Sequence, residues 1–92
     1  MTNIAIRQDG SLRKLVCNGR TIAYDGRITS IENVSAGRWE GKTNDDETFE
    51  VIGGRASGGA SNEWFVRWLP GFGDKYIPVK SAAEALRAIE LC

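Results

Sequence analysis

Residues 4–24 read IAIRQDGSLRKLVCNGRTIAY, and this stretch decides the fold class. Two turn dipeptides, Asp9-Gly10 and Asn18-Gly19, separate three short runs in which apolar and polar residues alternate. Asp-Gly and Asn-Gly between alternating runs are the strongest local signals for a β-hairpin. The stretch therefore predicts an antiparallel meander of three strands.

The register of the meander follows from the centres of its two turns. Turns centred on the two dipeptides place Leu15 opposite both Ile4 and Ile22. Side chains alternate between the two faces of a strand, so one face becomes mostly apolar. We expect that core face to hold Ile4, Ile6, Leu15, Cys17, Ile22 and Tyr24.

Further strand patterns follow in the second half of the chain. Residues 39–43 and 48–52 flank a polar, acidic turn and predict a second hairpin. Residues 64–69, WFVRWL, predict a strand whose tryptophans fit core packing better than base stacking, because a thin core needs large aromatic side chains. Residues 76–79 contain Pro78, which restricts a strand to the edge of a sheet.

Two segments are less regular. Residues 27–37 carry Ile28, Ile31 and Val34 at helical spacing, although a continuing strand fits as well, and we favour a short helix or turn. Residues 53–62 are rich in glycine and lack the spacing of a phosphate-binding loop, so they predict a long connection that can lie over a partner.

The end of the chain predicts a helix. Residues 81–84, SAAE, form a capping box, and the apolar positions that follow repeat at helical spacing. On this helix we expect Arg87 and Glu90 to face water. The fold class is therefore α+β: one compact domain over residues 1–92, with an antiparallel sheet of about six strands covered by the C-terminal helix.

Composition argues against catalysis. The chain has 92 residues and no histidine, so it lacks the usual general base and the commonest metal ligand. Cys17 and Cys92 are too far apart for a metal or redox motif; we expect the first to be buried and the second exposed. We expect no enzymatic activity, no cofactor and no metal. Residues 1–7 lack a secretory signal, and no apolar run is long enough to span a bilayer, which predicts an intracellular protein.

Charge is unevenly distributed although the net charge is zero. Residues 1–27 carry five cations and two anions, and residues 32–50 carry two cations and six anions. Arginine forms forked hydrogen bonds to carboxylates and phosphates, so the basic residues are the candidates for partner or RNA binding. These candidates are Arg7, Arg13, Lys14, Arg20, Arg27, Arg55 and Lys75.

The segments 37–42, GRWEGK, and 63–75, EWFVRWLPGFGDK, resemble small phage accessory proteins, as do the length, the neutral charge and the SAAEAL ending at 81–86. More narrowly, the chain is similar to anti-CRISPR proteins that act on the type I-F surveillance complex. The resemblance implies a stoichiometric inhibitor in the cytoplasm of the infected bacterium. It would bind Cas backbone subunits, with guide RNA as a further contact, and prevent target DNA from hybridising.

Two modes of binding and two other functions remain open at this point. The acidic residues of 40–50 could imitate phosphates, but such mimics are usually strongly acidic overall, so we favour contact through the basic residues. A small phage assembly protein would self-associate through the strand at 64–69 or an edge strand. A free nucleic-acid-binding module would lose affinity steeply with salt, and the neutral charge disfavours it.

Overall fold

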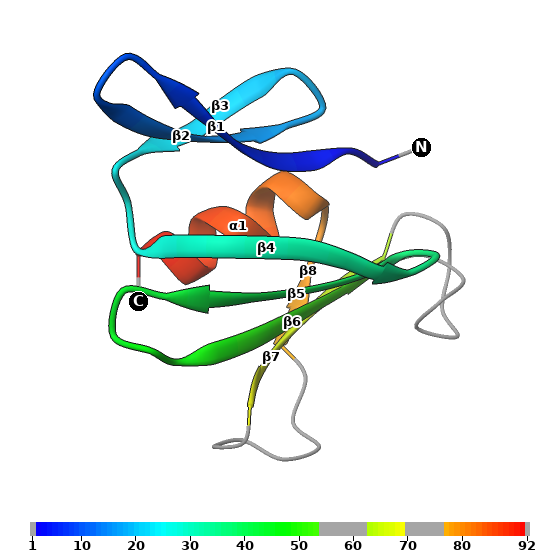
Figure 1. Ribbon diagram of the computed structural model, residues 1–92. Coiled ribbons are helices and arrows are strands. Elements are labelled where there is room, and N and C mark those ends of the chain that lie inside the picture. Colours follow the sequence, from blue (N-terminus) through cyan, green and yellow to red (C-terminus); the bar gives the residue numbers. More distant parts are fainter. Residues whose placement is uncertain (1, 54–62, 70–76, 92) are drawn as a thin grey trace.

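The computed structural model describes residues 2–53, 63–69 and 77–91 and places them in two antiparallel sheets and one helix (Figure 1). The first sheet has the order β1-β2-β3, and the second has the order β4-β5-β6-β7-β8. The strands are β1 (Ile4–Asp9), β2 (Leu12–Cys17), β3 (Arg20–Tyr24), β4 (Ile28–Ser35), β5 (Arg38–Thr43), β6 (Thr48–Gly53), β7 (Trp64–Leu69) and β8 (Ile77–Val79), and the helix is α1 (Ala82–Glu90). The α+β class is confirmed, with more strands than predicted and two sheets in place of one.

The first hairpin has a different register from the one predicted. Leu15 lies opposite Ile6 and Cys17 lies opposite Ile4, because the strands turn at residues 10–11 and not at residues 9–10. This change moves the pairing by two residues, and a two-residue shift leaves every side chain on its expected face. Ile4, Leu15 and Cys17 are accordingly buried.

The second hairpin departs from prediction at Ile22. Pairing runs as expected from Cys17 opposite Arg20, but Leu15 then lies opposite Ala23, so Ile22 is an extra residue on β3. Such a bulge changes the alternation of faces beyond it. Tyr24 therefore lies opposite Lys14 on the outer face, with 53% of its surface exposed, and its predicted place in the core is wrong.

Residues 28–35 form the strand β4 and not a short helix or turn. Ile28 faces Thr43, and Ile31 faces Gly41, with a break in register between them. The bulge adds one residue between two inward positions, which turns the usual spacing of two into three. Spacing of three is also the mark of a helix, and this coincidence explains the wrong prediction.

The remaining elements form as predicted. The hairpin β5–β6 and the strand β7 occupy the expected residues, and β8 with Pro78 lies at the edge of its sheet. The Ser81 hydroxyl oxygen accepts a hydrogen bond from the Glu84 backbone N–H at 3.1 Å, which caps α1. The predicted glycine-rich connection lies almost entirely outside the described residues.

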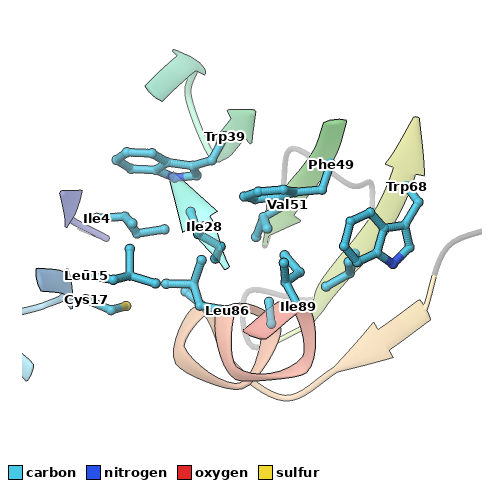
Figure 2. Packing of buried hydrophobic residues seen from close by; sticks show 13 residues of the cluster. Ile4, Leu15, Cys17, Ile28, Trp39, Phe49, Val51, Trp68, Leu86 and Ile89 are labelled. Atoms are coloured by element: carbon cyan, nitrogen blue, oxygen red, sulfur yellow. The ribbon is translucent and has the colours of Figure 1, made fainter. Parts of the chain in front are cut away.

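One hydrophobic cluster joins both sheets to the helix (Figure 2). Ile4, Leu15 and Cys17 come from the first sheet, and the buried residues of α1 are Ala82, Ala85, Leu86 and Ile89. From the second sheet come Ile28, Trp39, Phe49, Val51, Val66 and Trp68, which confirms the core interpretation of the aromatic strand. The rings of Phe49 and Trp68 meet edge to face with their centroids 6.1 Å apart. No helix in the described part of the chain has the length and hydropathy needed to cross a membrane.

Candidate functional site: the outer face of the meander

The outer face of β1–β3 is the side turned away from the hydrophobic cluster, and we call it the meander face. Its central row runs across the three strands, with Arg7 opposite Lys14 and Lys14 opposite Tyr24. The next row contains Ala5, Val16 and Thr21. A shallow hollow of about 270 Å³ covers much of this face, lined by Asn3, Ala5, Arg7, Lys14, Val16, Gly19 and Thr21.

Arg7 and Lys14 are like charges in directly opposite positions. Arg7 is exposed and Lys14 is half-buried, and neither forms an ion pair with any residue that the structure describes. Like charges opposite one another on adjacent strands destabilise a sheet. This pair therefore has no evident role in folding, and its charge is available to a carboxylate or a phosphate from outside.

Arg20 and Arg13 lie elsewhere. Arg20 pairs with the inward-facing Cys17, so it belongs to the other face of the sheet, where it is exposed at the strand end. Arg13 lies on the inner face, and its guanidinium Nη2 donates a hydrogen bond to the Gly26 carbonyl at 2.7 Å. Among the members of the predicted binding set that the structure describes, only Arg7 and Lys14 are brought together. Arg55 and Lys75 lie outside the described residues.

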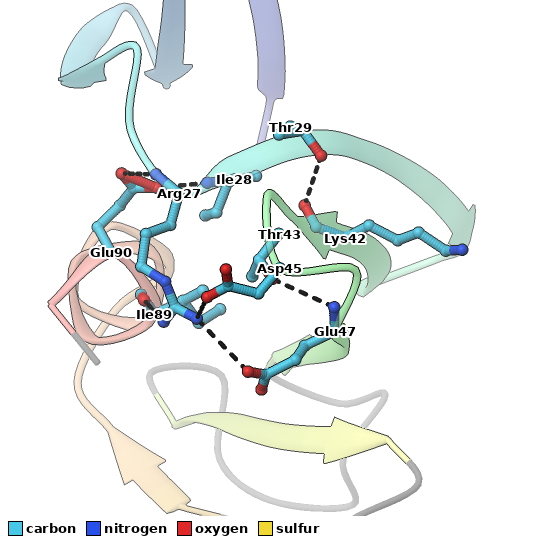
Figure 3. Close-up of polar contacts among 9 residues, drawn as sticks. All are labelled: Arg27, Ile28, Thr29, Lys42, Thr43, Asp45, Glu47, Ile89 and Glu90. Atoms are coloured by element: carbon cyan, nitrogen blue, oxygen red, sulfur yellow. Dashed lines mark hydrogen bonds and ion pairs between the residues drawn. The ribbon is translucent and has the colours of Figure 1, made fainter.

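Arg27 occupies the junction between the two sheets (Figure 3). Its guanidinium donates to the carbonyl of Ile89 at 3.1 Å and pairs with Asp45 at 3.4 Å and Glu47 at 3.7 Å. The same group lies over the ring of Trp68, with Cζ 5.7 Å from the centroid. Its side chain is only 19% exposed. These contacts tie the junction to α1 and to the turn between β5 and β6, so Arg27 has a structural role in the free protein.

Glu90 completes this junction from the helix, although we predicted that it would face water. Its carboxylate accepts hydrogen bonds from the backbone N–H of Arg27 at 2.9 Å and of Ile28 at 2.7 Å. The absence of a side chain at Gly26 permits this approach, because a Cβ there would collide with the Glu90 carboxylate. A helix side chain more than sixty residues away in the sequence therefore fixes the backbone of the segment that connects the two sheets.

The acidic residues of the second sheet are mostly neutralised within the protein. Glu50 is 5% exposed and pairs with Arg38 at 3.6 Å and Arg67 at 3.4 Å. Asp46 pairs with Lys42 at 3.6 Å. With Asp45 and Glu47 held by Arg27, most of the residues that could have imitated phosphates are engaged internally. Glu32 and Glu40 remain opposite one another, beside a hollow of about 450 Å³ on the outer face of β4–β6.

Cys17 is buried directly behind the meander face. Burial raises the pKa of its thiol above the ordinary 9.0, and the positive charge of Arg87 partly opposes this effect. A neutral, buried thiol is a poor nucleophile. In the described ranges, no group of three or more cysteine, aspartate or glutamate residues is arranged to hold a metal ion.

Sequence reasoning missed two exposed residues of the meander face, Tyr24 and Leu12. Tyr24 was assigned to the core because the bulge at Ile22 leaves no local signal. Leu12 is 43% exposed and shares the outer face with Lys14, two positions further along β2. No protein-family model, curated protein or solved structure matches the chain, so the site rests on its own geometry.

Proposed function

We propose that the protein is a phage anti-CRISPR inhibitor that binds the type I-F surveillance complex through the meander face. The resemblance described above supports the class of target. Two opposed like-charge pairs have no ion-pair partner among the described residues, Glu32 with Glu40 and Arg7 with Lys14, and each weakens its sheet. Because we expect contact through basic residues, the pair Arg7 and Lys14 is the observation that carries the choice of surface. A charged pair that costs stability is expected where binding, and not folding, requires it.

The inhibitor would act by covering a surface of the surveillance complex and not by catalysing a reaction. A surveillance complex holds its guide RNA in a positively charged channel and keeps the target strand there through backbone contacts. Its proteins and guide RNA both present anionic groups that a paired arginine and lysine can contact. A rigid sheet bound stoichiometrically at such a position would prevent target DNA from hybridising.

Self-association, the first alternative, is disfavoured at three of the four sheet edges, and the regular strand β1 is the remaining edge. Pro78 interrupts the short β8, a bulge at Ile22 distorts β3, and two irregularities in register distort β4. Proline and bulges are the devices by which proteins block edge-to-edge pairing. The second alternative, a free nucleic-acid-binding module, is disfavoured because the meander face has only two central cations and the whole chain has a net charge of zero.

The test is retention of the purified surveillance complex by the tagged protein, followed by a target-DNA binding assay on the retained complex. We expect retention with loss of DNA binding. Arg7→Glu/Lys14→Glu should weaken affinity for the complex at least tenfold while the protein remains folded. Arg27→Glu is unsuitable as a binding variant, because that side chain supports the fold.

The matched control is Lys42→Glu/Lys80→Glu, which changes the net charge by the same amount on the β4–β8 side of the molecule. This variant should bind the complex nearly as well as the wild type. Equal losses in both variants would show that net charge alone controls binding, and an unchanged affinity of the Arg7→Glu/Lys14→Glu protein would remove the meander face from the proposal.

A further inference from the structure

We infer that Tyr24 and Leu12 are apolar anchors of the meander face, and that the surface bound there is protein, with carboxylates beside an apolar recess. This inference rests on the proposed function and specifies which component of the target the face contacts. It concerns two residues that the charge pattern did not select.

The positions of these side chains follow from the strand pairing. Tyr24 lies directly opposite Lys14 and extends the row that begins with Arg7. Leu12 lies two residues before Lys14 on β2, on the same face. Tyr24 is 53% exposed and Leu12 is 43% exposed, which makes them two of the few large apolar side chains that the described surface presents to solvent.

The bulge at Ile22 is the structural cause of this arrangement. Without it, regular alternation would turn Tyr24 toward the core, as the sequence predicted. With the bulge, two residues, Ile22 and Ala23, separate the outward-facing Thr21 from Tyr24. The ring of Tyr24 therefore lies on the outer face beside Lys14. Bulges often serve to redirect a side chain toward a functional surface.

The mixture of side chains fits a protein partner better than a nucleic acid. Tyrosine and arginine are enriched among the residues that dominate protein–protein affinity, and an aliphatic side chain such as Leu12 adds desolvated area there. Nucleic-acid surfaces instead combine aromatic platforms with several cations along the backbone path. The meander face has two central cations, with the acidic Asp9 opposite Leu12 at its rim. Carboxylates for Arg7 and Lys14, next to a recess for Tyr24 and Leu12, complement this face.

Binding kinetics at two salt concentrations test the inference on the intact surveillance complex. Charged residues act mainly on the association rate and are screened by salt, whereas buried apolar anchors act on the dissociation rate. Tyr24→Ala/Leu12→Ala should raise the dissociation rate at least tenfold at both salt concentrations. Arg7→Ala/Lys14→Ala should lower the association rate, with a smaller effect at high salt. Tyr24→Phe should keep most of the affinity because the ring remains.

The control is Val34→Ala/Ile77→Ala, two apolar side chains of 43% and 44% exposure on the second sheet, which should leave both rates unchanged. Thermal unfolding of each variant shows that the fold is kept. Normal dissociation of the Tyr24→Ala/Leu12→Ala protein from a complex that the wild type binds would overturn this inference and leave the proposed function standing. Tight, Tyr24-dependent binding to guide RNA alone would also overturn it, since the partner would then be nucleic acid. Failure of the wild type to bind the complex would overturn both proposals.

Discussion

Arg7 and Arg27 come from the same basic segment, yet the fold gives them opposite environments. Arg7 lies exposed on the meander face opposite another cation, whereas Arg27 is largely buried among two carboxylates, a helix carbonyl and an indole ring. Arg27 therefore supports the fold, and Arg7 imposes a small cost on it. The comparison teaches that residue type and position in the chain do not separate a binding arginine from a structural one; the partners around the guanidinium do.

The largest expected effect is at the junction. Arg27→Ala removes a hydrogen bond to a helix carbonyl, two ion pairs and a cation–π contact in a largely buried position, and should lower the free energy of unfolding by about 2 to 3 kcal/mol. Urea denaturation followed by tryptophan fluorescence measures this. Arg7→Ala is the matched control and should be near neutral. Equal free energies of unfolding for the two variants would contradict the conclusion that Arg27, and not Arg7, stabilises the fold.

A second, smaller effect is expected from the helix side of the junction. Glu90→Gln keeps one carbonyl acceptor but presents an amide N–H₂ to one of the two backbone donors, which should cost about 1 to 2 kcal/mol. Gly26→Ala should cost a comparable amount by displacing the same carboxylate, and the double variant should lose less than the sum of the two single losses. Simple additivity in urea denaturation would show that the two positions are not coupled.

Alkaline pH offers a third test, at the residue behind the meander face. The folded-state pKa of Cys17 is raised above its unfolded value, so its contribution to stability is complete below that unfolded value, near 9.0, and is lost as pH rises toward the folded pKa. The expected loss is up to about 1.4 kcal/mol for each pH unit in that window. Denaturation of wild type and Cys17→Ala at pH 8 to 11 should show a steeper decline in the wild type. Parallel curves would mean that the thiol titrates alike in both states.

The smallest expected change in stability, that of Arg7→Glu, tests most directly whether Arg7 differs from Arg27 in its role. Arg7→Glu converts a pair of like charges into a pair of opposite charges across β1 and β2, and should raise stability by about 0.2 to 1 kcal/mol even as it weakens binding. Arg7→Gln should give an intermediate gain, and high salt should reduce both. A loss of stability in Arg7→Glu would show that Arg7 supports the fold after all.

Prediction from sequence succeeded where local signals act over a few residues. The turn at Asn18-Gly19, the capping box at Ser81 and the restriction of Pro78 to an edge each depend on backbone preferences of neighbouring residues. It failed at Ile22 and between Ile28 and Ile31, where one extra residue alters the alternation of faces. A bulge depends on how a strand pairs with its neighbour, so the sequence of the bulged strand alone does not predict it. At Asp9-Gly10 the hairpin was predicted but its turn lies one residue later, at residues 10–11.

The candidate site shows the same division. Arg7 and Lys14 lie on one outer face, as alternation from the core positions Ile6 and Leu15 requires. The separation of Arg13, Arg20 and Arg27 from them could not be predicted, because it depends on which distant groups lie within reach of each guanidinium. Tyr24 could not be found for a related reason, since its exposure follows from a bulge.

Hydrophobic periodicity and turn chemistry are local properties, and they suffice to predict the α+β class, the three-stranded meander, the capped C-terminal helix and the identity of most core residues. Three features arise only on folding: the strands divide into two sheets, Arg27 and Glu90 hold the junction between them, and Tyr24 lies beside Lys14 in the row that begins with Arg7. Those features depend on contacts between segments far apart in the chain, and their geometry exists only once the chain has folded.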